Sequence, residues 1–110
     1  MTRGIVTVHE YLDAFSNRDI LRLSSLLSPD VMLRDWEQFE QGKANVVAAT
    51  ARIFDSCSII TLNLVNLVGN EIVVIAEIAV SFDNKKSIHI VDVYEFDDDG
   101  NIASIRAFKG

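Results

Sequence analysis

The chain has 110 residues, which is the size of one domain and excludes a two-domain enzyme. Ten Lys and Arg residues against 16 Asp and Glu residues give a net charge of −6, which argues against a nucleic-acid partner because phosphate binding requires clustered cations. Apolar residues make up 49% of the chain, so we expect one domain over residues 1–110 with a core of its own.

Two helices are predicted at the N-terminus. Apolar residues recur there at spacings of three and four, at Ile5, Val8, Tyr11, Leu12 and Phe15. This stripe predicts an amphipathic helix over 5–15. Asp19 can cap a second helix by accepting backbone N–H bonds. That helix is expected over 20–27, because Ser28-Pro29-Asp30 ends it.

A short strand, a third helix and four more strands follow. Residues 31–35 alternate, with Val31, Leu33 and Asp35 on one face, and a polar loop then leads to a helix over 44–54. Turn-forming residues separate four alternating segments at 58–68, 71–82, 86–96 and 102–108. This order predicts an α+β fold, in which helices cover one face of a curved, mostly antiparallel sheet and leave a cavity for a small ligand.

One carboxyl interrupts an apolar face of the segment 86–96. That face carries Ile88, Ile90, Asp92, Tyr94 and Phe96. An ionised carboxylate is costly to bury alone, so such a group usually takes up a proton and becomes a hydrogen-bond donor. The structural alternative is that the face is partly exposed, or that a nearby donor satisfies the carboxylate.

Two more polar side chains are predicted to face the same interior. Asp35 ends a strand whose preceding same-face residues are apolar, and two carboxyls in different settings can divide acid and base duties. Its structural alternative is an aspartate that helps the following loop turn. Tyr11 lies on the buried stripe of the first helix, where its hydroxyl needs a partner, although an ordinary core tyrosine fits as well.

Five segments of the chain together resemble one known family. They are Tyr11-Leu12-Asp13-Ala14-Phe15, Arg18-Asp19, Leu33-Arg34-Asp35, Val91-Asp92-Val93-Tyr94-Glu95-Phe96 and Asp99-Gly100-Asn101-Ile102. In order and spacing they are similar to the bacterial ketosteroid isomerases, within the broader group of nuclear transport factor 2-like (NTF2-like) proteins and SnoaL-type polyketide cyclases. The resemblance covers nearly the whole chain and implies the cone-shaped NTF2-like fold, with three N-terminal helices packed on the sheet.

The resemblance also implies a reaction, which is proton transfer next to a ketone. Asp35 falls on the general base, and Tyr11 and Asp92 fall on the two donors of the oxyanion hole. Ionised Asp35 would take a proton from a carbon alpha or gamma to the carbonyl and return it elsewhere. Tyr11 and neutral Asp92 would stabilise the dienolate oxygen.

The implied ligand is a small, hydrophobic, carbonyl-containing molecule, and we expect neither a cofactor nor a metal. The apolar side chains expected to bind it are Phe15, Trp36, Ile78, Ile90 and Ile105. Trp36 stands where the isomerases have proline, and Lys109 where a pocket aromatic is usual. These two differences predict a remodelled pocket mouth.

Two other functions stay open on the same fold. In the first, the chain is a non-catalytic ligand-binding or dimerisation module, in which Asp92 merely bonds Tyr11 and Trp36 or other side chains fill the cavity. In the second, the chain catalyses another SnoaL-like reaction, carried out by a cyclase, dehydratase or hydrolase.

Two possible metal-binding signals are weak. The segment Asp97-Asp98-Asp99-Gly100 resembles part of a calcium loop, but Arg106 occupies the position that requires a bidentate glutamate, so we interpret it as a hairpin turn. His9 and His89 are too few for a metal site without further ligands. His89 is also out of phase with Asp92, which puts it on the opposite sheet face.

That opposite face predicts assembly. Apolar residues occupy both phases of one strand, as Val73, Ile75 and Ala79 alternate with Ile72, Val74, Ile78 and Val80. A sheet covered on one side should be polar on the other. We therefore expect a second copy to cover this face in a homodimer, the alternative being cover by loops or the C-terminus.

Cysteine use and apolar runs bear on the compartment. Cys57 is the only cysteine and can form no internal disulfide, which favours a reducing compartment and a cytoplasmic location. The run 4–8 is too short for a signal peptide, and the run 72–76 is too short for a membrane span. We expect no membrane association.

Overall fold

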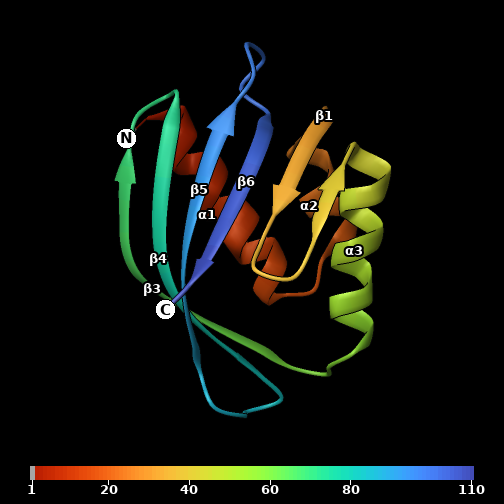
Figure 1. Cartoon of the computed structure of the whole chain (residues 1–110). Helices are drawn as coiled ribbons and strands as arrows, with labels where there is room; N and C mark the ends of the chain where they lie inside the picture. Colours follow the sequence, from red (N-terminus) through yellow and green to blue (C-terminus); the bar gives the residue numbers. More distant parts are fainter. Residues whose placement is uncertain (1) are drawn as a thin grey trace.

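The computed structural model describes residues 2–110, which form three helices and six strands. The helices are α1 (Arg3–Ser16), α2 (Ile20–Ser25) and α3 (Lys43–Asp55). The strands are β1 (Leu27–Arg34), β2 (Phe39–Gln41), β3 (Ile60–Gly69), β4 (Val73–Phe82), β5 (Ile88–Phe96) and β6 (Ile102–Lys109). Figure 1 shows their arrangement.

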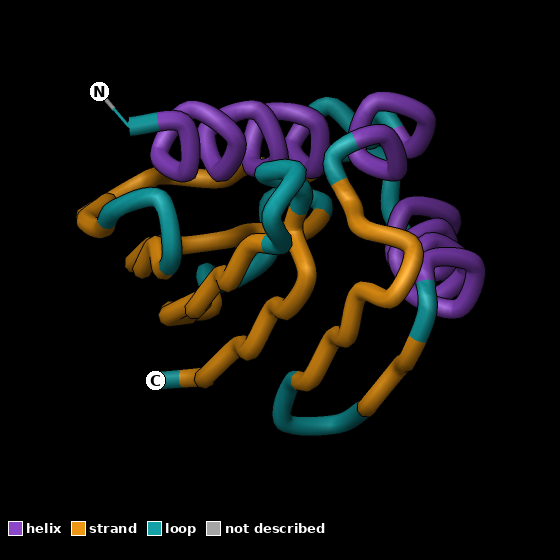
Figure 2. The backbone as a smooth tube through the Cα atoms, turned by 90° about the horizontal axis from the view of Figure 1, so that it is seen from above, coloured by secondary structure: helices purple, strands orange, loops and turns teal. Residues whose placement is uncertain are grey.

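One sheet contains all six described strands, in the order β2-β1-β6-β5-β4-β3. Neighbouring strands are antiparallel except β1 and β6, which are parallel. Helix α1 packs on β3 and β4, while α3 packs on β1 and β2. Figure 2 shows the sheet curving beneath the helices. The predicted α+β arrangement, with helices on one face of a mostly antiparallel sheet, is confirmed.

The second helix is shorter than predicted, because the residues expected at its end pair with the sheet instead. It ends at Ser25, and Leu27 already pairs with Ile102 as the first residue of β1. The Ile102 N–H donates to the Leu26 carbonyl at 2.8 Å, which supplies the pairing that helical hydrogen bonds would have made. Pro29 lies inside β1, where the register shifts between Leu27 and Met32, and such an irregularity tolerates a residue without an N–H.

Strand β2 lies in the segment that was predicted to be a polar loop. Its three residues pair with β1 through Met32 and Gln41, Leu33 and Glu40, and Arg34 and Phe39. No Asn-Gly or similar turn signal marks this hairpin in the sequence. The connection instead depends on Asp35, whose hydrogen bonds are described below.

Two minor expectations hold. The Asp97 carboxylate accepts from the backbone N–H groups of Asp99 and Asn101, so the acidic segment is a hairpin turn as interpreted. His89 lies on the outer sheet face, where its Nε2 is 2.7 Å from Glu77 Oε2.

None of the helices in residues 2–110 has the length and apolar character that a membrane span requires.

The outer face of the sheet exposes apolar side chains in register. Val68 pairs with Ile75 across β3 and β4, and Ile75 pairs with Val93 across β4 and β5. Val68 is 59% exposed, and Phe108 on β6 is 55% exposed. Val68, Ile75 and Val93 form a row across neighbouring strands, and Phe108 lies two residues from its register on β6, opposite Val91. A second copy could bury this exposed area. The homodimer stays a prediction.

If two copies pair through this row, the protein is a dimer at micromolar concentration, and Ile75→Glu converts it to a monomer. A charge at this position would be buried without a partner, which costs several kcal/mol. Light scattering coupled to size-exclusion chromatography measures the mass of both proteins. The matched control is Thr61→Glu, an exposed position near the far end of β3. A monomeric wild type contradicts the prediction.

Candidate active site

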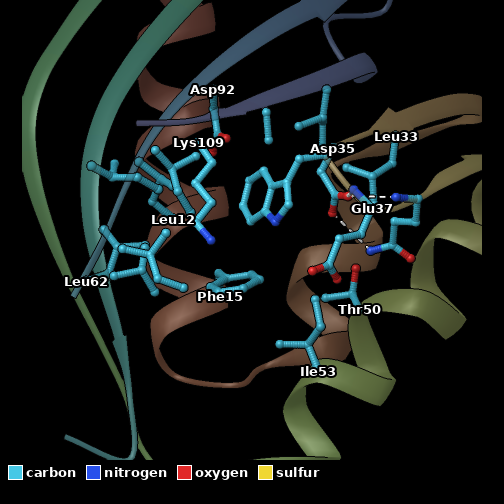
Figure 3. Close-up of a pocket in the computed structure, with 18 of the residues that line it drawn as sticks. Leu12, Phe15, Leu33, Asp35, Glu37, Thr50, Ile53, Leu62, Asp92 and Lys109 are labelled. Carbon is cyan, nitrogen blue, oxygen red and sulfur yellow. Dashed lines mark hydrogen bonds between the residues drawn. The ribbon is translucent and has the colours of Figure 1, made fainter. Parts of the chain in front are cut away.

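A pocket of about 390 Å³ lies on the inner, helix-covered face of the sheet. Side chains from α1, α3, β1, the β1–β2 turn and strands β3 to β6 line it. All eight side chains predicted for the site are among them: Tyr11, Phe15, Asp35, Trp36, Ile78, Ile90, Asp92 and Ile105. Figure 3 shows the close-up. The structure thus brings the predicted residues to one cavity, and their action on a ligand stays a prediction.

Strand alternation determines which residues of β5 and β6 enter the pocket. Ile90 and Asp92 on β5 have the same phase, as do Ile105, Ala107 and Lys109 on β6. The pairing of Asp92 with Ala107 brings the two rows together. The pocket floor is therefore apolar with one carboxyl on β5, and the exposed side chain of Lys109 at the end of β6 adds one ammonium group to the lining.

Asp92 is 8% exposed and has one side-chain hydrogen bond, from Tyr94. The Tyr94 hydroxyl donates to Asp92 Oδ2 at 2.7 Å. Burial raises the pKa of Asp92 to about 6, and the hydrogen bond from Tyr94 opposes that rise because it stabilises the ionised form. Asp92 is consequently neutral in about half of the molecules at pH 6 and ionised in most of them at pH 7.

Tyr94 is the hydrogen-bond partner of Asp92 that the sequence analysis did not single out. It is fully buried, and both the buried position and the Asp92 charge raise its pKa well above the usual value. The signal was available, because residues two apart on a strand share a face and Tyr94 had been put in the same row as Asp92. The bond between Asp92 and Tyr11, which belonged to the alternative of a non-catalytic module, is absent among the described residues, and Asp92 bonds Tyr94 instead.

Tyr11 contributes a hydroxyl without a hydrogen-bond partner among the described residues. Its ring packs edge-on against Tyr94, with centroids 5.5 Å apart. Within residues 2–110 no hydrogen bond engages the Tyr11 hydroxyl, and the only unpaired polar side-chain atom fully sealed from solvent is Ser28 Oγ. The Tyr11 hydroxyl is therefore reachable from the pocket. Burial, with the Asp92 charge as a second cause, raises the pKa of Tyr11, so the group is a donor at every ordinary pH.

Asp35 both shapes the β1–β2 turn and lines the pocket. Its Oδ1 accepts from the backbone N–H groups of Glu37 and Gln38 at 2.7 and 2.8 Å. Its Oδ2 accepts from Gln38 Nε2 at 3.1 Å. The turn-forming role left open by the sequence is therefore present. The same three bonds fix the carboxylate in space, on the opposite side of the pocket from Asp92 (Figure 3).

Trp36 leaves the cavity open. Its side chain is 43% exposed, and the ammonium group of Lys109 lies 5.8 Å from the centroid of its ring. The pocket keeps about 390 Å³ with Trp36 in this position. This volume is at the lower end of the range of small-molecule sites, so Trp36 does not fill the cavity. The non-catalytic ligand-binding module stays an alternative.

Comparison with known families agrees with this architecture. The model of the SnoaL-like domain matches residues 8–105. The chain belongs to the SnoaL-like domain family, within the NTF2-like superfamily. No curated protein matches the chain in sequence.

Three solved structures illustrate the similarity in fold. A candidate ketosteroid isomerase from Kribbella flavida has a TM-score of 0.85 at 14% identity, covering 98% of this chain and 78% of the other. An LEH-like epoxide hydrolase from M. tuberculosis has a TM-score of 0.83 at 18% identity, covering 98% and 83%. A candidate polyketide cyclase from Sinorhizobium meliloti has a TM-score of 0.81 at 20% identity, covering 92% of each chain. At these identities the similarity establishes the fold alone.

The burial of Asp92 predicts a pH dependence of stability. The folded pKa of about 6 is above the usual 3.8, so the folded protein binds this proton more tightly than the unfolded chain does. The stabilisation that comes from this tighter proton binding is fully present below pH 4. As pH rises to about 6 it is lost, and the free energy of unfolding falls by on the order of 3 kcal/mol.

Asp92→Asn should remove this pH dependence, since the amide oxygen still accepts from Tyr94 but does not titrate. Urea unfolding of both proteins at pH 4, 5, 6 and 7 measures the difference. Asp98→Asn, in the exposed β5–β6 turn, is the control for a lost surface charge. Parallel pH profiles for wild type and Asp92→Asn would contradict the assignment.

Proposed function

We propose that this protein is a small-molecule isomerase that moves a proton between the carbons alpha and gamma to a ketone. The observation that carries the proposal is the set of three groups around one apolar pocket: the fixed carboxylate of Asp35, the free hydroxyl of Tyr11 and the buried carboxyl of Asp92. The candidate ketosteroid isomerase among the structural neighbours agrees with this class.

The substrate of the proposed reaction is a β,γ-unsaturated ketone. Its carbonyl oxygen lies near Tyr11 and neutral Asp92 when the reaction begins. Asp35 removes the alpha proton, and the electrons of the C–H bond move into a dienolate whose oxygen accepts two hydrogen bonds. Asp35 then returns the same proton to the gamma carbon. The carbonyl re-forms, so the double bond has moved with no net gain or loss of atoms or electrons.

Each group suits its proposed role. The three hydrogen bonds to Asp35 hold the base at one position, which lowers the cost of orienting it. The apolar walls strengthen hydrogen bonds to a developing negative charge, because they exclude water. Neutral Asp92 can accept from Tyr94 through Oδ2 and donate from its other oxygen to the dienolate.

A second candidate function follows from the pKa of Asp92. A carboxyl with a pKa of about 6 is well matched to general-base catalysis at neutral pH. In this scheme ionised Asp92 is the base of a SnoaL-like hydrolase or cyclase, Tyr11 is the proton donor, and Asp35 serves the turn. This second candidate is supported by the presence of an epoxide hydrolase and a candidate polyketide cyclase among the structural neighbours.

Asp35→Asn should lower the rate of isomerisation of cyclohex-3-en-1-one by at least about 100-fold, because the amide does not accept a proton from carbon. Its oxygen still accepts from the two backbone N–H groups, so the turn is preserved. Ultraviolet absorbance of the conjugated product follows the reaction, with Asp98→Asn as the control. Equal rates for the wild type and Asp35→Asn, or no wild-type turnover at any pH, would exclude the isomerase.

The pH profile separates the two candidates. If neutral Asp92 donates to the dienolate, the isomerisation rate falls as pH rises through about 6, and this fall is absent in Asp92→Asn. If ionised Asp92 is the base, activity rises through the same pH. Initial rates between pH 5 and pH 8 for both proteins give the sign, and a rise would contradict the isomerase mechanism.

A further inference from the structure

The pocket contains one positively charged side chain. Of the described residues that line it, only Lys109 is a cation, against the carboxyl groups of Asp35, Glu37 and Asp92. Lys109 ends β6 in register with Ile90, on the inner face of the sheet. Its position in the fold therefore turns a lysine toward an apolar cavity.

The Lys109 charge has no carboxylate partner within residues 2–110. The four ion pairs described there involve other residues, so no carboxylate oxygen lies within 4.0 Å of its ammonium group. Figure 3 shows Asp35 and Glu37 together on one side of the pocket, with Lys109 on the other side, which is that of Asp92. These two acids, half-buried Asp35 and exposed Glu37, therefore do not neutralise it.

The contact with Trp36 accounts for the path of the Lys109 carbon chain. It accounts less well for the position of the ammonium group. A lysine commonly lays its carbon chain on an apolar surface and keeps the ammonium in water. At 5.8 Å from the ring centroid, however, the ammonium is near the limit of about 6 Å for a cation–π contact. Such a contact at an exposed site is weak, so it leaves the ammonium group with capacity for an anion.

Strand register sets the distance between the two polar ends of the pocket. Asp92 pairs with Ala107, and Lys109 is two residues farther along β6. Two residues of strand span roughly 7 Å. A ligand whose carbonyl oxygen lies at Tyr11 and Asp92 can therefore present a second group to Lys109 across a short apolar body.

We propose that Lys109 binds an anionic group of the substrate, so that the pocket takes a keto acid: an apolar ketone with a carboxylate at its other end. This inference rests on the proposed function for the position of the ketone. The apolar lining of Phe15, Ile78 and Ile105 accommodates the body of the molecule. A neutral ketone of the same shape leaves the Lys109 charge without a partner.

The test compares three phenols, which mimic the dienolate. They are 4-ethylphenol, 3-(4-hydroxyphenyl)propanoate and 4-(2-aminoethyl)phenol, which are neutral, anionic and cationic at their far ends. Calorimetric titration at pH 6 and low salt should give about fivefold to tenfold tighter binding of the carboxylate than of 4-ethylphenol, and the weakest binding of the amine. The preference should shrink as salt is added.

Variants assign the preference to Lys109. Lys109→Met keeps a flexible apolar stem against Trp36 and should remove the preference for the carboxylate, whereas Lys109→Arg should retain it. Lys86→Met, which removes an exposed charge outside the pocket, is the matched control and should change nothing. Binding of 4-ethylphenol should stay within about twofold in all three variants, since it does not depend on the charge.

A fourth probe separates this inference from the proposed function. The compound 3-cyclohexylpropanoate has the carboxylate but no phenol, so its binding reports on Lys109 alone. Its binding by the wild type and loss in Lys109→Met would support the anion site even if no phenol binds. If 4-ethylphenol binds but neither carboxylate gains from Lys109, the keto-acid inference is overturned and the isomerase proposal is left standing. If no probe binds through Lys109, the inference is overturned as well.

Discussion

Asp92 is placed by strand alternation in a row of buried side chains, and the polar end of the pocket is organised around the cost of that burial. Its carboxyl lies between Ile90 and Tyr94 and is largely removed from water. The pKa of Asp92 therefore rises to about 6 instead of staying near 3.8. The Tyr94 hydroxyl offsets part of the cost. Tyr94 is thereby committed to Asp92, and the ring of Tyr11 packs against it with its own hydroxyl left for the pocket.

In the proposed function, one set of hydrogen bonds to Asp35 serves both the fold and the chemistry. The bonds from Glu37 and Gln38 close the turn that pairs β2 with β1, and they also hold the carboxylate at the pocket wall. A side chain fixed in this way loses little freedom when it meets a ligand. The turn-forming and catalytic interpretations of Asp35 are consequently compatible, and the proposed function uses both.

Most of the architecture followed from local periodicity. The helix stripe around Tyr11, the third helix and the four alternating segments were predictable because spacing along the chain determines which residues share a face. The end of α2 and strand β2 were missed. The end of α2 depends on a distant segment, since Ile102 fixes the start of β1, whereas β2 depends on the Asp35 turn, for which the sequence has no Asn-Gly signal.

The candidate site divides in the same way. The amino-acid order alone places Asp92 on an apolar strand face and Tyr11 on a buried helical stripe, because both assignments follow from the repeat of the backbone. Only the tertiary structure shows that Tyr94 is the partner of Asp92. It also decides that Lys109 lines the same pocket as Asp35, on the other side. These contacts depend on strand register and on how α1 and the β1–β2 turn lie over the sheet, which bring together residues up to about one hundred positions apart, and no local pattern encodes such distances.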